Sequence, residues 1–117
     1  MTSPTSCAIE QRSVGEITVV SVTGTVDMLT APQLEQAIGA AAKDSPAAVV
    51  VDLGAVEFLA SAGMGVLVAA HGELIPAVRF VVVADGPATS RPLKLVGIAD
   101  VVDLYPTLDE ALAALAT

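Results

Sequence analysis

Apolar residues along this chain follow two patterns, one typical of strands and the other of helices. Residues 7–24 predict a β-hairpin that turns at Gly15, with an alternation of period two over Ile17, Val19 and Ser21. Residues 47–54 and 77–85 contain continuous apolar runs of strand length, as expected for strands covered on both faces. A shorter run over residues 101–105 predicts an edge strand.

Helical patterns separate these strands. Residues 30–44 carry apolar side chains three and four positions apart, and a second helix is expected to begin at Ser61. A short third helix within residues 87–100 is expected to stop at Gly97, and a fourth covers residues 107–116. This order of elements predicts an α/β fold, a mixed and largely parallel sheet of about five strands with about four helices packed against it.

Hydroxyl residues mark the expected starts of three helices. Thr30 and Ser61 are each placed to cap a helix, and Thr107 forms a capping box with Glu110 three residues later. Nothing in a capping role for Ser61 requires the glycines Gly63 and Gly65, since each costs up to about 1 kcal/mol inside a helix. Two glycines in a first turn indicate close approach of another backbone, from a neighbouring element or from a partner.

Length and composition limit the classes of protein to which the chain belongs. Residues 1–117 suffice for one domain with a single core, and residues 1–6 are expected to fray. No apolar segment reaches the roughly 18 to 20 residues that span a bilayer, and the first ten residues do not resemble an export signal, so we expect a cytoplasmic protein without membrane contact. A net charge of −8 argues against nucleic acid as a partner.

Enzymatic and ligand-binding classes find little support. The nucleophile elbow is incomplete because Leu59 occupies its first glycine position, and His71 follows Ser61 by ten residues on one helix. A glycine-rich nucleotide motif is incomplete at Val68, and a single histidine and a single cysteine, Cys7, do not form a metal site. We therefore expect no catalytic residue, no metal and no cofactor.

Three stretches of the sequence resemble one known family. They are "VTGTVDMLTAPQLEQAI" (22–38), "VVVDLGAVEFLASAGMGVLV" (49–68) and "ADGPATSRPLKLVGIADVV" (84–102). They are similar to the STAS family, and within it to the bacterial anti-sigma factor antagonists, over nearly the whole chain. The family fold, a mixed sheet with helices, agrees with the order of elements predicted above.

This resemblance implies a regulatory switch without catalysis. An unphosphorylated antagonist binds an anti-sigma factor that is also a serine kinase, phosphorylation dissolves the complex, and a serine phosphatase resets it. The family's acceptor serine matches Ser61. The resemblance places the surface that contacts the partner at these residues: Thr25, Asp27, Ala60, Ala62, Gly63, Met64, Gly65 and Arg91.

The chain departs from the family motif at two positions. Ala60 stands where the family has an aspartate before the acceptor, and Ala62 replaces a second hydroxyl residue. Loss of the aspartate favours a constitutive STAS adaptor for a transporter or signalling assembly. Two further hypotheses stay open, a small nucleotide-binding domain, from "GMG" at a helix start, and redox control through a Cys7 disulfide between two copies.

Overall fold

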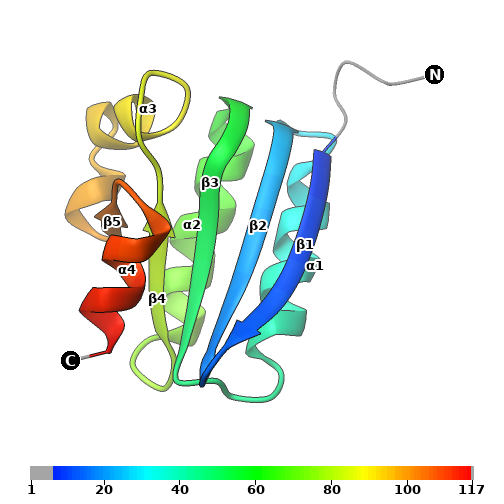
Figure 1. The fold of residues 1–117 in the computed structure, drawn as a ribbon. Coiled ribbons are helices and arrows are strands. Elements are labelled where there is room, and N and C mark those ends of the chain that lie inside the picture. The colour runs from blue at the N-terminus through cyan, green and yellow to red at the C-terminus, as the bar shows by residue number, and fades with distance from the viewer. Residues whose placement is uncertain (1–6, 117) are drawn as a thin grey trace.

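The computed structural model describes residues 7–116, so the fraying expected for residues 1–6 lies outside the described range. One five-stranded sheet forms the centre of the molecule (Figure 1). In sheet order its strands are β1 (Cys7–Val14), β2 (Ile17–Val26), β3 (Ala48–Leu59), β4 (Arg79–Val83) and β5 (Asp103–Tyr105). β1 and β2 form the predicted antiparallel hairpin through Gly15, whereas β2, β3, β4 and β5 are parallel.

Helices cover both faces of this sheet. They are α1 (Ala31–Ala42), α2 (Ser61–Leu74), α3 (Ser90–Leu95) and α4 (Leu108–Leu115), with a 3-10 turn η1 (Ile98–Asp100) before β5. α1 and α2 lie on one face, α4 lies on the other, and α3 lies beyond the carboxyl end of β4 (Figure 1). The predicted fold class is confirmed, and β5 is the predicted edge strand.

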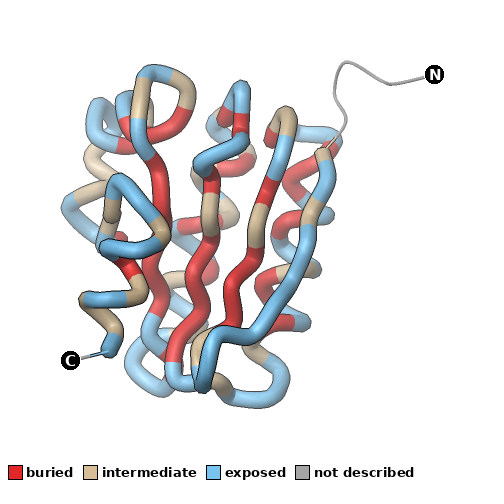
Figure 2. Tube along the Cα trace, viewed as in Figure 1, coloured by how far each residue is buried: buried red, intermediate tan, exposed pale blue. Residues whose placement is uncertain are grey.

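The core consists of two layers separated by the sheet. Val49 and Val51 of β3 pack toward α1 and α2, whereas Val50 between them packs toward α4. Because successive side chains of a strand point to opposite faces, a strand buried on both sides needs the continuous apolar run seen in the sequence. Figure 2 shows the resulting band of buried residues along the central strands.

β3 is longer than the apolar run that predicted it. The strand was expected at residues 47–54 with a loop before the second helix, but it continues to Leu59 and the helix begins almost at once. The extension pairs with the end of β2, where register shifts interrupt the regular alternation. Those irregularities place both Glu57 and Phe58 at exposed positions, and the expected period of two is lost.

The three predicted caps have different outcomes. Thr107 is confirmed, because its hydroxyl accepts a hydrogen bond from the N–H of Glu110 at 3.1 Å. Thr30 occupies the cap position of α1 but makes no capping hydrogen bond. The cap predicted at Ser61 is wrong, since Ala60 holds the cap position of α2 and Ser61 is the first helical residue. The third helix ends before Gly97, as predicted, and Gly97 adopts φ +83°.

Candidate functional site

The predicted site lies at the carboxyl edge of the sheet. β2, β3 and β4 run parallel, so their carboxyl ends lie at the same edge of the sheet and lead into α1, α2 and α3 (Figure 1). The N–H of Ala60 donates to the carbonyl of Val26 at 2.8 Å. This hydrogen bond joins the start of α2 to the loop between β2 and α1.

Asp27 and Thr30 determine the conformation of the loop between β2 and α1. The Asp27 Oδ1 atom accepts from the N–H groups of Leu29 at 2.9 Å and of Thr30 at 3.1 Å. The buried Thr30 hydroxyl accepts from the Asp27 N–H at 2.9 Å and donates to the Thr25 carbonyl at 2.8 Å. These bonds explain why the Thr30 hydroxyl does not cap α1. They also give the Asp27 carboxylate a positioning role inside the loop.

Ser61 is exposed in the first turn of α2. Within residues 7–116 its hydroxyl makes no hydrogen bond, and α2 has no side-chain cap. The first helical hydrogen bond runs from the Met64 N–H to the Ala60 carbonyl at 3.1 Å. The N–H groups of Ser61, Ala62 and Gly63 therefore lie at the open end of the helix, next to the Ser61 hydroxyl.

Gly63 and Gly65 lie on opposite sides of this turn. A Cβ added to Gly63 would lie 2.5 Å from Cγ1 of Val26 and 2.8 Å from Cδ1 of Leu59. Gly63 is therefore buried in tight packing of α2 on the sheet and presents little surface to a partner, which argues against its place in the predicted contact set. A Cβ added to Gly65 would meet no atom within 4 Å, and Gly65 is exposed.

The remaining predicted contact residues are distributed over three elements. Thr25 is half-buried at the end of β2, opposite Phe58 of β3. Ala62 and Met64 are half-buried in the first turn of α2, and Met64 packs on the core. Arg91 is exposed on α3, and its backbone N–H donates to the carbonyl of Gly86 at 3.2 Å.

Exposed apolar side chains near the site were missed by the sequence analysis. Met28 is 77% exposed and Leu29 is 69% exposed at the tip of the loop between β2 and α1. Phe58, 55% exposed, lies near the carboxyl end of β3. The available signal was a pair of large apolar residues directly after Asp27, in a segment where turn residues are usually polar.

The structure gives little support to hydrolytic, metal or nucleotide chemistry. His71 lies in the last turn of α2, about 15 Å along the helix from Ser61. Residues 7–116 contain no group of three His, Cys, Asp or Glu side chains placed to hold a metal ion. A nucleotide-binding loop follows its strand directly, and α2 does begin directly after β3. However, Gly63 and Gly65 both lie inside the helix, so they form no loop that could surround a phosphate.

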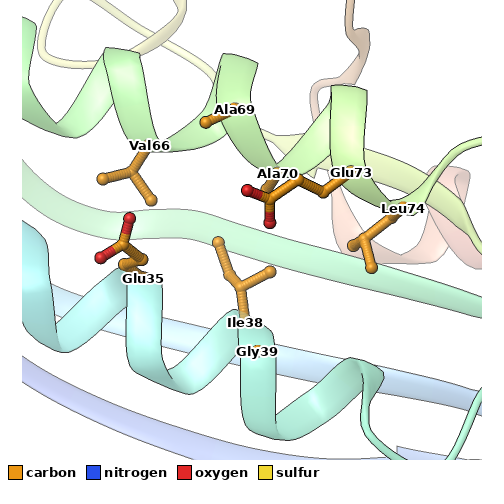
Figure 3. Close-up of a pocket in the computed structure, with 8 residues that line it drawn as sticks. All are labelled: Glu35, Ile38, Gly39, Val66, Ala69, Ala70, Glu73 and Leu74. Carbon is orange, nitrogen blue, oxygen red and sulfur yellow. The ribbon is translucent and has the colours of Figure 1, made fainter.

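A groove between α1 and α2 is too small to hold a nucleotide. The carboxylates of Glu35 and Glu73 project into it from the two helices (Figure 3). Its volume of about 60 Å³ lies well below the roughly 300 Å³ at which ligand pockets begin.

Among helices of the described part of the chain, none is long and apolar enough to cross a membrane.

Cys7 is a half-buried residue at the start of β1 that packs against the core. Burial, and to a lesser degree the charge of Asp27, raises the pKa of the Cys7 thiol. Both causes disfavour the thiolate, which is the form that attacks a disulfide or another oxidised sulfur. The raised pKa lowers the reactivity of the thiol, and Cys7 packs against the core as a small, partly buried side chain.

Comparisons with known proteins agree with this architecture. The profile of the STAS domain family matches residues 8–111. The anti-sigma-F factor antagonist RsfB of Mycobacterium tuberculosis is 40% identical over 112 residues, which are 96% of this chain and 92% of RsfB. The crystal structure of an anti-sigma factor antagonist from Mycobacterium paratuberculosis is 49% identical, with a TM-score of 0.94 and full coverage of both chains.

A more distant likeness concerns the fold alone. The Bacillus cell fate determinant SpoIIAA in its phosphorylated form is 20% identical, with a TM-score of 0.69 over 92% of this chain and 99% of SpoIIAA. The family match spans β1 to α4, and so includes the sheet, the loop at Asp27 and the turn at Ser61. The chain belongs to the STAS domain family.

Proposed function

We propose that this chain is an anti-sigma factor antagonist whose binding is controlled by phosphorylation of Ser61. In its unphosphorylated form it binds an anti-sigma factor that is also a serine kinase, and thereby releases the sigma factor. The kinase phosphorylates Ser61 and dissociates, and a serine phosphatase restores the binding form. The chain itself acts as a substrate and binding partner and carries out no catalysis.

One observation carries this proposal. The Ser61 hydroxyl is exposed at the start of α2 and has no hydrogen-bond partner within residues 7–116. A serine that capped the helix would contribute about 1 kcal/mol to stability, but Ser61 makes no capping hydrogen bond. The names of the mycobacterial relatives, both anti-sigma factor antagonists, supply the class of partner.

A phosphate on Ser61 would be tolerated by the fold. It would lie at the open end of α2, where free N–H groups and the helix dipole favour negative charge. In a complex, however, it would add about 1.5 to 2 negative charges to the covered surface. An unpaired buried charge costs several kcal/mol, which corresponds to on the order of 100-fold or more in affinity. Folding is therefore preserved while binding is lost.

The competing hypothesis is a constitutive STAS adaptor that is not phosphorylated. Ala60 at the position before Ser61 favours it, because no carboxylate there orients the hydroxyl for a kinase. The two hypotheses differ in how binding depends on the charge at Ser61. An adaptor binds its partner equally well whatever the charge at Ser61, whereas a switch does not.

Titration calorimetry with an anti-sigma factor of the class that RsfB antagonises tests the proposal. Wild type and Ser61→Ala should bind with equal affinity, Ser61→Glu more weakly, and protein phosphorylated by the kinase about 100-fold more weakly. Mass spectrometry after incubation with the kinase and ATP should find phosphate on wild type and none on Ser61→Ala. Equal binding by all forms, with no phosphate gained, would establish the adaptor instead.

Thermal unfolding of Ser61→Ala is the necessary control. Because the hydroxyl makes no hydrogen bond within residues 7–116, we expect the free energy of unfolding to change by less than about 0.5 kcal/mol. A loss near 1 kcal/mol, the usual value for a cap, would mean that Ser61 stabilises α2 in solution. Binding differences among the Ser61 variants are then read against equal stability.

A further inference from the structure

The tip of the loop between β2 and α1 combines exposure with order. Met28 and Leu29 are more exposed than most large apolar side chains of the described chain, at 77% and 69%. Their backbone is nonetheless held by the Asp27 carboxylate and the buried Thr30 hydroxyl. A loop fixed in this way loses little further conformational entropy when a partner covers it, so more of the contact energy contributes to binding.

This tip and Ser61 share one rigid support. Val26 lies directly before Asp27, and its carbonyl accepts the hydrogen bond from Ala60 at 2.8 Å. The Val26 side chain is buried beneath Gly63, with a distance of 2.5 Å to an added Cβ. A partner that reaches the Ser61 hydroxyl therefore meets the tip at a fixed position on the same edge of the sheet.

The loop tip and the start of α2 carry no charged side chains, although the chain as a whole is strongly acidic. Residues 28–34 and 58–70 contain no Asp, Glu, Lys, Arg or His, although the net charge of the chain is −8. Within these segments a partner covers no formal charge, so the desolvation that opposes burial of charged surface arises only from neighbours such as Asp27 and Glu57. An uncharged surface with exposed apolar side chains is typical of the centre of a protein interface.

We propose that Met28 and Leu29 are the apolar anchor of the anti-sigma factor, inserting into an apolar socket on that protein beside the point where it contacts Ser61. The inference rests on the proposed function, which supplies the anti-sigma factor as partner, and adds the residues that hold it. Binding at Met28 and Leu29 positions the kinase next to Ser61 and contributes to the specificity for one anti-sigma factor over others. Asp27 acts as a positioning residue that presents the two side chains.

A second copy of this chain is a poorer occupant for the tip. Stable interfaces cover about 800 Å² on each partner, far more than two side chains supply. A partner that also covers the uncharged turn at Ser61 reaches a larger continuous area. The anti-sigma factor must contact that turn if it phosphorylates Ser61, so the same approach brings it to the tip.

The test compares Met28→Ser/Leu29→Ser with a matched control, Val14→Ser. Val14 is also an exposed apolar residue, but it pairs with Ile17 at the turn of the β1–β2 hairpin. This turn lies at the amino end of the parallel strands, away from the start of α2 (Figure 1). Titration with the anti-sigma factor should show binding weakened about 10-fold or more for the double variant and unchanged for the control. At low concentrations of the antagonist, phosphorylation of Ser61 should slow by a similar factor. Leu29→Met should retain binding.

Each remaining outcome has a defined meaning. Binding of the double variant within about 2-fold of wild type, with all variants equally stable, overturns the anchor. A change in self-association during sedimentation, with binding to the anti-sigma factor intact, also overturns it and assigns the tip to a contact between copies. If the double variant binds weakly but Ser61→Glu binds like wild type, the anchor stands and the phosphorylation switch fails. If wild type does not bind the anti-sigma factor, both proposals fail.

Discussion

The inward and outward sides of α2 contrast within a few residues of one another. The inward side carries Gly63 and Leu67, both buried, and fits the sheet so closely that Gly63 has no room for a methyl group. The outward side carries Ser61, Gly65 and Val68, and an added Cβ at Gly65 meets nothing within 4 Å. Neither side carries a charge over residues 58–70.

This contrast shows that one residue type serves two physical needs. Gly63 satisfies a demand of the fold, because Val26 and Leu59 fill the space that a side chain would need. Gly65 satisfies no demand of the isolated domain and lowers the helix propensity of α2. The same holds for Gly39 of α1 and Gly72 of α2, which are also exposed and where an added Cβ would meet no atom within 4 Å.

The largest expected change in the free energy of unfolding is the one between a buried and an exposed position of α2. Leu67→Ala should lower the free energy of unfolding by about 2 to 5 kcal/mol, because the Leu67 side chain is fully buried and its removal leaves a cavity. Val68→Ala, at a residue 40% exposed, should change it by less than about 0.5 kcal/mol. Urea unfolding of both variants measures the difference. Similar losses for the two would contradict the assignment of inward and outward sides.

A smaller effect is expected at Gly63. Gly63→Ala should destabilise the domain by about 1 to 2 kcal/mol, since the strain of overpacking exceeds the roughly 1 kcal/mol gained in helix propensity. The clash involves branched, buried side chains of Val26 and Leu59, which have little freedom to move. Thermal unfolding is the measurement. A stability equal to or above that of wild type would show that the sheet relaxes around the methyl group.

The smallest effect is expected at Gly65 and has the opposite sign. Gly65→Ala should stabilise the domain by about 0.5 to 1 kcal/mol, because the methyl group meets no atom and the helix gains propensity. The same variant should weaken binding to the anti-sigma factor if the outward side is covered in the complex. Unfolding and calorimetric titration on one sample compare the two. Loss of stability would show that Gly65 is required by the fold.

Sequence patterns predicted the architecture well where burial alone decides it. The runs around Val50 and Val82 are apolar at every position because helices cover both faces of the sheet, and they gave the central strands. Thr107 indicated the start of α4, since the hydrogen bond from the Glu110 N–H to its hydroxyl is a local interaction, although the second hydrogen bond of a capping box is not formed within residues 7–116. The far end of β3 was missed because its register shifts depend on β2, a strand distant in sequence.

The local structure around the candidate site was predicted only in part. Ser61 was placed correctly at the start of a helix, but its capping role was wrong because Ala60 is held by the carbonyl of Val26. The Asp27 carboxylate also holds the loop, a role that the sequence did not indicate. Met28 and Leu29 stand out in the sequence as apolar residues of a turn segment, but only the fold shows that their side chains are exposed and not packed on the core.

By itself the sequence determined the α/β class, the order of the elements and the lack of charge around Ser61, since these follow from local composition and periodicity. Only the tertiary structure decided which glycine is packed, which hydroxyl is free and which apolar side chains are exposed. Those properties depend on contacts between β2, β3 and α2, segments that the sequence keeps apart and the parallel sheet brings together. The distinction between fold and function at α2 is therefore a property of packing.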